Sequence, residues 1–379
     1  MYDAVIVGAG VIGLACAWRA TRAGGSVAVL DPATPPAGAT QVSAGMLASV
    51  GEVAFAEDRL ARMTLASAAL WPDFVAELEA ESGIDTGYRR EGALHVALDR
   101  DEAAELRRVH ALQCEFGLEA KWLTPSGCRQ LEPGLAPSIA GGVSAPSESS
   151  VDPRRLALAM AGATEAAGGE LRFGTEVAAC IFDGSALTGV RTSDGDELRA
   201  RSVVVAAGAW SGGLGWLPRE ARPPVRPVKG EILELRSPDG PLACTRILAS
   251  ERVYLVPRSD GRLIAGATVE DRGFEETVSA GGVHELLREA YRLLPDVAEM
   301  EFVDAAAGLR PATPDNLPII GRSAMEGLIL ATGHYRNGVL LAPLTGQAVA
   351  KLLAGEVPPE EIADAQPQRF ERAPTGVPA

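Results

Sequence analysis

Three glycines near the start of the chain have the types and spacing needed to bind a phosphate. Gly8, Gly10 and Gly13 follow the apolar run 4–7 as G-x-G-x-x-G and open a helical stretch, 14–23. In this arrangement the first glycine permits a tight turn, the second lets a pyrophosphate approach the backbone, and the third lets the helix pack closely on the strand. Free N–H groups at the start of the helix would then face the phosphates.

A carboxylate completes this pattern. Asp31 closes a second apolar run, 27–30, where it can accept hydrogen bonds from an adenosine ribose. A glycine triplet alone is weak evidence, but a triplet between a strand and a helix, with an acid after the next strand, is a strong signal. The sequence therefore predicts a dinucleotide site, with a glycine-rich turn that binds nothing as the alternative.

The composition narrows the class of protein. The 379 residues are enough for a large core and two domains. The formal net charge of −15 argues against a nucleic-acid partner. No apolar run is long enough to cross a bilayer, and the N-terminus lacks a signal-peptide pattern. We therefore expect a cytoplasmic protein without stable membrane association.

The cysteines and histidines indicate neither disulfides nor a metal site. The four histidines are scattered, so no metal is expected. Buried free thiols in a reducing compartment are the expected state of the cysteines, because none of them forms a C-x-x-C pair. The five cysteines are Cys16, Cys114, Cys128, Cys180 and Cys244.

Hydrophobic periodicity predicts alternating strands and helices. Asp152 and Pro153 have the residue types preferred at a helix N-cap and first helical position. A tail from Glu371 onward is expected to fray. Helices are expected over 57–81, 101–116, 153–167, 284–294 and 339–353, and strands over 92–98, 231–235 and 328–332, in a ribbon of 186–191 with 197–201, and in a hairpin of 253–258 with 262–268.

Two stretches of small residues would let backbone approach a ligand closely. One is the loop 43–47. The other is a buried strand, 202–210, whose end at Ala207 and Gly208 is typical of a parallel strand beneath a cofactor. An ordinary flexible loop and a plain core strand are the alternatives.

Six motifs occur along the chain: GAGVIG at 8–13 with Asp31, SAGML at 43–47, VVVAAGAWS at 203–211, YLVPR at 254–258, GLRP at 308–311 and GHYRNG at 333–338. Together these motifs resemble the D-amino-acid-oxidase-like family of FAD-dependent amine oxidoreductases, and within it the glycine oxidases of thiamin thiazole synthesis. The resemblance covers nearly the whole chain, and GLRP and GHYRNG together are its most selective part.

The resemblance implies an α/β fold in which an FAD-binding Rossmann-like domain of the glutathione-reductase type carries an inserted α+β substrate domain with an antiparallel sheet. It also implies a homo-oligomer. We expect the FAD-binding domain over 1–85, 143–221 and 305–365, the substrate domain over 86–142 and 222–304, and a tail over 366–379.

The family's FAD contacts can be carried over position by position. Some members of the broader family tether the flavin through a cysteine, but the run 305–309 before Arg310 contains none, so we expect FAD to be held noncovalently. A helix starting at Val339 would direct its positive dipole end at reduced flavin, whereas an Asn-Gly turn without a ligand is the alternative. The implied contacts are Gly8, Gly10, Val11, Ile12, Gly13, Asp31 and Pro32; Ala39, Thr40, Ala44, Gly45 and Met46; Val177, Ala207 and Gly208; and His334, Tyr335, Arg336, Asn337, Gly338, Val339 and Leu340.

Arg310, Arg336 and Tyr254 match the family's substrate residues. Burying a substrate carboxylate unpaired would cost several kcal/mol or more, and the guanidinium fork of Arg310 can meet both of its oxygens. Arg336 touches substrate or serves neighbouring backbone. Tyr254 donates a hydrogen bond to the same carboxylate or is simply a core residue.

The implied reaction is the oxidative deamination of glycine and other small amines, such as sarcosine and D-alanine, with oxygen as acceptor and hydrogen peroxide as product. The substrate Cα–H would pass as hydride to the flavin, so that no general base is needed.

Other readings stay open on the sequence alone. A D-amino-acid dehydrogenase that reduces a quinone shares the motif at 308–311, and a sarcosine-type oxidase is close as well. A non-catalytic FAD-binding or assembly protein would keep the glycine turn without needing a buried substrate cation. An NAD-only dehydrogenase would leave the segments 43–47 and 334–338 without a role.

Overall fold

The computed structural model describes residues 1–238 and 244–370, and the chain divides into two compact units. Unit 1 comprises Met1–Ala37, Met160–Pro227 and Arg310–Ala379, and unit 2 comprises Gly38–Ala159 and Val228–Leu309. The sequence places 38–85 and 143–159 in the FAD-binding domain, whereas their packing groups them with unit 2. A boundary drawn from cofactor contacts need not follow a boundary drawn from packing, so the predicted functional domains stay a prediction.

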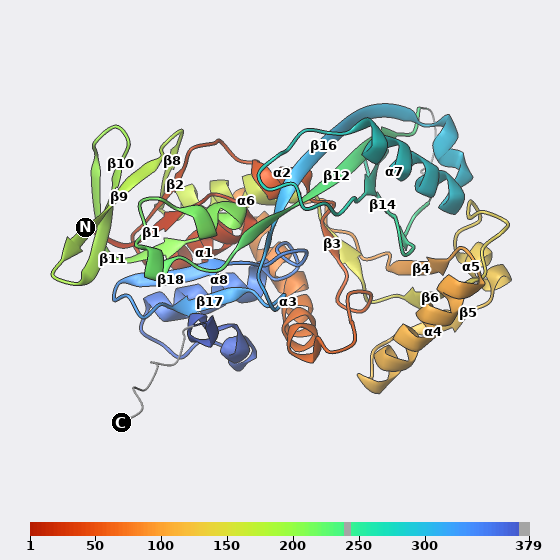
Figure 1. Cartoon of the computed structure of the whole chain (residues 1–379), viewed down its shortest axis with the longest axis horizontal. Helices are drawn as coiled ribbons and strands as arrows, with labels where there is room; N and C mark the ends of the chain where they lie inside the picture. The colour runs from red at the N-terminus through yellow and green to blue at the C-terminus, as the bar shows by residue number, and fades with distance from the viewer. Residues whose placement is uncertain (239–243, 371–379) are drawn as a thin grey trace, which may run out of the picture. The chain divides into compact units, whose positions relative to one another are not determined.

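Unit 1 is built on an eight-stranded sheet with the order β17-β18-β11-β1-β2-β8 and a β9–β10 ribbon attached to β11 (Figure 1). Pairing is parallel from β18 to β8, and β17 is an antiparallel edge strand. The central strands are almost continuously buried and apolar, as parallel strands covered on both faces are. The strands are β1 Tyr2–Val7, β2 Val27–Asp31, β8 Glu170–Phe173, β9 Val177–Asp183, β10 Ala186–Thr192, β11 Glu197–Val205, β17 Ile319–Arg322 and β18 Leu328–Thr332.

Strand β11 joins two stretches that the sequence pattern separates. Its first half, 197–201, alternates between exposed and buried and pairs with β10 in the predicted ribbon. Its second half, 202–205, is fully buried between β1 and β18. The change of pattern at Ser202 marks the point where one strand passes from the ribbon into the sheet interior.

Helices α1 (Val11–Arg22) and α8 (Ala342–Leu353) contact each other in unit 1. The contact is close because a Cβ on Gly346 would lie 2.7 Å from the carbonyl oxygen of Ala15. The predicted start of α8 at Val339 is wrong by three residues. Residues 339–341 form a turn instead, in which the N–H of Leu341 donates to the carbonyl of Asn337.

Unit 2 contains most of a second eight-stranded sheet, with the order β16-β12-β15-β14-β13-β4-β6-β5. The predicted hairpin is confirmed: β14 and β15 pair antiparallel, with Tyr254 opposite Gly266. Strands β13 and β4 pair in parallel, and β16 continues into unit 1. The strands are β4 Ala93–Ala97, β5 Lys121–Leu123, β6 Gly141–Ala145, β12 Arg226–Arg236, β13 Ile247–Ala249, β14 Tyr254–Pro257, β15 Arg262–Gly266 and β16 Glu301–Ala312.

The longer helices of unit 2, α3, α4 and α7, follow the predicted pattern, with side-chain caps at several ends, whereas the short helix α2 was not predicted. Thr124 caps α5 by accepting from the N–H of Gly127, and Ser279 caps α7 by accepting from Gly282, so α7 begins before the predicted His284. A short ribbon pairs β3 (Met46–Leu47) with β7 (Ser149–Ser150). The helices are α2 Gly38–Val42, α3 Asp58–Ser82, α4 Arg100–Glu115, α5 Pro125–Leu131 and α7 Ala280–Leu293, with α6 Pro153–Ala166 crossing into unit 1.

Five short 3-10 helices occur in the described residues, and two of them lie at the end of the described chain. Of the predicted tail, Pro367–Phe370 forms a 3-10 helix in which Arg369 pairs with Asp315; the rest, from Glu371 onward, lies outside the described residues. The 3-10 helices are η1 Gly208–Gly213, η2 Arg219–Ala221, η3 Pro295–Glu299, η4 Glu360–Ala365 and η5 Pro367–Phe370. None of the helices in the described ranges has both the length and the apolar character of a membrane span.

Candidate active site

The phosphate turn of unit 1 has the geometry that the glycine spacing predicts. Gly8 has a φ of +111°, and a Cβ there would collide with the carbonyl oxygen of Ala206. A Cβ on Gly13 would collide with the carbonyl oxygen of Gly8. Gly10 is the N-cap of α1 and provides no side-chain cap, so an external anion can take that place at the helix N-terminus.

Asp31 has a second role that the sequence pattern does not reveal. Its Oδ2 accepts from the N–H of Ala9 at 2.6 Å, and its Oδ1 accepts from the N–H of Ala33 at 2.8 Å. The carboxylate therefore holds the phosphate turn in place. Each oxygen keeps a further lone pair for a ribose hydroxyl, so the predicted ribose role is compatible with this arrangement.

The end of β11 adjoins the phosphate turn, since the N–H of Ala206 donates to the carbonyl of Val7 at 2.8 Å. Gly208 has a φ of +52°, and its carbonyl accepts from Oγ1 of Thr332 at 3.2 Å. Thr332 is in turn 2.7 Å from Oγ of Ser211. The buried hydroxyl groups of Ser211 and Thr332 thus fix the end of β11. The only sequence signal for this pair is that each residue comes at the end of an apolar strand or shortly after it.

The remaining predicted FAD residues of unit 1 differ in exposure. Val177 begins β9 and packs in the core with Val5 and Leu30. Pro32 is exposed in the bend after β2.

The two predicted substrate arginines of unit 1 come from segments that the fold brings together. Arg310 lies in β16 and is half-buried, whereas Arg336 is exposed in the loop before α8. The N–H of Tyr335 donates to the carbonyl of Pro311 at 2.8 Å, which joins the neighbours of the two arginines. Tyr335 has a φ of +47°, so this junction is a bent, hydrogen-bonded structure rather than an open loop.

His334 anchors the same loop to α8. Its side chain is buried, and its Nε2 lies 3.0 Å from Oγ1 of Thr345. Burial lowers the pKa of His334 to about 3. The ring is therefore neutral near pH 7.

In unit 2, the predicted FAD residues Ala44, Gly45 and Met46 lie against the segment 149–151. Gly45 has a φ of +66°, and its carbonyl accepts from the N–H of Val151 at 2.9 Å. Ala39 and Thr40 lie in the short helix α2 rather than in an irregular loop. Tyr254 lies across the hairpin from Gly266, where any Cβ would collide with the tyrosine ring.

A buried glutamate, which the sequence analysis did not single out, holds the chain after β3. Glu148 accepts hydrogen bonds from the N–H groups of Val50, at 3.1 Å, and Gly51. Its Oε2 lies 3.3 Å from Nε2 of His95. Burial is the largest single influence and opposes protonation of His95, but the charge of Glu148, its hydrogen bond to the ring and the charge of Glu52 together outweigh burial, so the pKa of His95 is raised.

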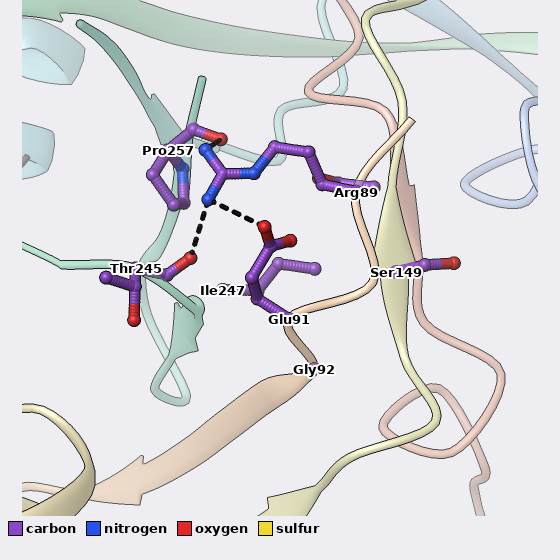
Figure 2. Close-up of a pocket in the computed structure, with 8 residues that line it drawn as sticks. Arg89, Glu91, Gly92, Ser149, Thr245, Ile247 and Pro257 are labelled. Carbon is purple, nitrogen blue, oxygen red and sulfur yellow. Dashed lines mark hydrogen bonds and ion pairs between the residues drawn. The ribbon is translucent and has the colours of Figure 1, made fainter. Parts of the chain in front are cut away.

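A small pocket in unit 2 lies beside the segment 149–150 and contains none of the predicted site residues (Figure 2). Arg89 reaches across it and donates to the carbonyl of Thr245 at 3.2 Å, while Glu91 lies 3.2 Å from the same nitrogen. The charge of the Arg89 guanidinium is thus already balanced by Glu91 inside the pocket. We therefore assign Arg89 a structural role, in which it connects its own segment to that of Thr245. The lining residues are Arg89, Glu91, Gly92, Ser149, Ser150, Thr245, Ile247 and Pro257.

The parallel sheet, the uncapped glycine turn and the acid that ends β2 define a dinucleotide-binding protein. The sequence profile of the DAO family, described as FAD dependent oxidoreductase, matches residues 3–352. The chain belongs to this family, and its cofactor is FAD. The turn at Gly8–Gly13 and the uncapped start of α1 fit the FAD pyrophosphate.

Within this family, the chain is similar to proteins named glycine oxidase and ThiO/ThiG. The chain is 38% identical to a glycine oxidase of Geobacillus kaustophilus over 93% of either chain. It is 35% identical to a bifunctional protein ThiO/ThiG of Trichormus variabilis, of which it covers 56%. The crystal structure of the glycine oxidase from Geobacillus kaustophilus matches with a TM-score of 0.90 and 36% identity, over 98% of this chain and 99% of that one. The predicted fold class is thereby confirmed.

Proposed function

We propose that this protein is a glycine oxidase. It catalyses the FAD-dependent oxidative deamination of glycine and other small primary or secondary amines, including sarcosine and D-alanine, to the imine and then the 2-oxo acid, and reduces oxygen to hydrogen peroxide. Similarity to glycine oxidases along almost the whole chain supports this proposal. The observation that carries it is the Pro311–Tyr335 hydrogen bond, because it joins the segments of two arginines suited to a substrate carboxylate.

Three residues of the chain have distinct parts in this proposal. Arg310 pairs with the substrate carboxylate, Arg336 gives further support, and Tyr254 donates a hydrogen bond. Together they orient the amine so that its Cα–H points at the cofactor. FAD, when bound, supplies the two-electron acceptor. We propose noncovalent attachment, because no cysteine occurs within 305–309.

The cellular setting is part of the same proposal. Similarity to ThiO/ThiG proteins supports a role in thiamin thiazole synthesis, with the chain acting as the oxidase. A homo-oligomer stays a prediction from the family resemblance, and a cytoplasmic location stays a prediction from the composition of the chain.

A direct assay tests the proposal. The purified protein should show a flavin absorption spectrum and release hydrogen peroxide with glycine, sarcosine or D-alanine. Bleaching by a D-amino acid without peroxide, but with quinone reduction, would indicate a dehydrogenase instead. A flavin that no small amine bleaches under anaerobic conditions would contradict an oxidase and favour a binding or assembly protein. Acid precipitation should release the yellow colour into the supernatant, since covalent FAD would stay in the pellet.

A further inference from the structure

Arg258 is a buried cation whose hydrogen bonds go to backbone carbonyl groups. Its side chain follows β14 and is only 4% exposed. One terminal nitrogen donates to the carbonyl of Val151 at 2.8 Å, and the other donates to the carbonyl of Ala44 at 2.5 Å. Its Nε has no hydrogen-bond partner among the described residues. Burial lowers the pKa of Arg258 to about 10.

The two carbonyl groups belong to segments that are far apart in sequence and already paired with each other. Met46 pairs with Ser150 in the β3–β7 ribbon, and the N–H of Val151 donates to Gly45. A Cβ on Gly45 would collide with the carbonyl oxygen of Val151, so the two backbones are in close contact. Arg258 thus attaches the residues that flank the two strands of the ribbon, Ala44 before β3 and Val151 after β7, to the end of β14.

Surrounding charges explain how a buried guanidinium is tolerated. The carboxylate of Asp152 favours the charged form of Arg258. Asp152 is itself held by Arg262, with a distance of 2.6 Å between Oδ2 and the guanidinium nitrogen. Burying a cation is costly unless nearby groups compensate, and two neutral carbonyl groups compensate only in part. A lysine in this place would lack the planar fork that reaches two carbonyl groups at a fixed separation.

We propose that Arg258 is a positioning residue that fixes the backbone of Ala44–Met46 in the conformation that receives FAD. The inference rests on the proposed function, because the family resemblance assigns these residues to the cofactor. A binding segment held by distant side chains is pre-organised, so less ordering is required when the ligand binds.

The test compares Arg258→Met and Arg258→Lys with Arg246→Met. Arg246 is a matched control: it also belongs to unit 2, donates to the carbonyl of Leu131 and pairs with buried Glu132, which lies far in sequence from 44–46. Apoprotein is titrated with FAD, and the spectrum of the bound flavin is recorded. Hydrogen exchange of the amides at 44–47 and 149–151 is measured without FAD.

We expect Arg258→Met to raise the dissociation constant for FAD at least tenfold, to accelerate exchange at 44–47 and 149–151, and to blur the fine structure of the flavin spectrum. Arg258→Lys should restore part of the affinity. Arg246→Met should lower the melting temperature but change the dissociation constant less than twofold. If Arg258→Met does not fold, Arg258→Lys is tested in its place, and its dissociation constant for FAD is expected to rise at least threefold.

Wild-type FAD affinity and exchange in the Arg258 variants would overturn the inference and leave the proposed function intact. So would an equal loss of FAD affinity in Arg246→Met, since the effect would then reflect general stability. A wild-type protein that does not bind FAD would instead overturn the proposed function itself.

Discussion

The phosphate turn of unit 1 and the Ala44–Met46 segment of unit 2 are both expected to contact FAD, but the chain builds them in different ways. The turn is local: Gly8 and Gly13 meet within six residues, and the acid that supports it ends the next strand. Ala44–Met46 is held by Val151 and by Arg258, which is 214 residues from Ala44. A site formed by residues close in sequence can be predicted from the sequence. A site held by residues distant in sequence depends on contacts that form only in the tertiary structure.

The largest effect is expected in the local site. Gly8→Ala places a Cβ on the carbonyl oxygen of Ala206 and forces an alanine to a φ of +111°. We expect a loss of about 3 kcal/mol or more in the free energy of unfolding, together with the loss of bound FAD. Denaturant unfolding and the flavin absorbance measure both quantities.

Gly24→Ala is the control for that variant. Gly24 has a φ of +88°, but a Cβ there would meet no atom within 4 Å. Backbone strain alone should cost about 1 kcal/mol and leave FAD binding unchanged. Equal losses in the two variants would mean that strain, and not the close approach of β11, makes Gly8 necessary.

The pairing of the two arginine segments gives the next effect. Arg310→Ala should raise the apparent KM for glycine roughly tenfold or more while FAD stays bound, because a charge-assisted hydrogen bond to the carboxylate is lost. Arg336→Ala should have a smaller effect, since its side chain is exposed. Steady-state kinetics of peroxide release provides the measurement, and unchanged kinetics in Arg310→Ala would remove it from the substrate site.

The His95–Glu148 pair, which holds the backbone of Val50 and Gly51 after the Ala44–Met46 segment, is expected to make the stability of the protein depend on pH. The raised pKa of His95 depends on Glu148, with Glu52 contributing further negative charge. A raised folded-state pKa means that the stabilisation is fully present below the unfolded pKa of about 6.5 and is lost as the pH rises through the folded value. His95→Gln should therefore cost about 1–2 kcal/mol near pH 6 and less near pH 9.

Thermal unfolding of the wild type and His95→Gln at both pH values measures this difference. The same loss at both pH values would show that the ring acts only by shape or by a neutral hydrogen bond.

The smallest effect concerns the thiols. The expectation of buried cysteines is confirmed for Cys16, Cys128 and Cys244. Cys180 is only half-buried, and the expectation is wrong for Cys114, which is exposed. Cys114→Ser should change stability by less than about 0.5 kcal/mol and remove a thiol that reacts rapidly in the folded protein. Burial raises the pKa of Cys128 to about 11, so its labelling should require unfolding. A thiol titration before and after denaturation checks both statements.

Element types could be predicted well because their causes are local. The apolar runs at β1 and β2, the period of α3 and the Ser259–Gly261 turn all gave the correct structure. Boundaries were less secure where a side chain or a distant strand decides them. Ser279 extends α7 at its start, and β18 draws 202–205 into the sheet interior and so joins two predicted strands into one.

The candidate site shows the same division. Gly8, Gly13 and Asp31 could be assigned to the dinucleotide turn from their types and spacing. Thr332, Ser211, Glu148 and Arg258 could not, because hydroxyl, carboxylate and guanidinium groups are common and gain meaning only from buried partners.

The sequence by itself determined the phosphate turn, because backbone sterics and hydrophobic periodicity act between residues close along the chain, and its motifs indicated the family and the FAD cofactor by resemblance. The tertiary structure alone decided that Asp31 supports the turn, that Pro311 meets Tyr335 and that Arg258 holds Ala44. Hydrogen bonds of this kind reach only about 3 Å, so they exist where folding has already brought distant segments into contact.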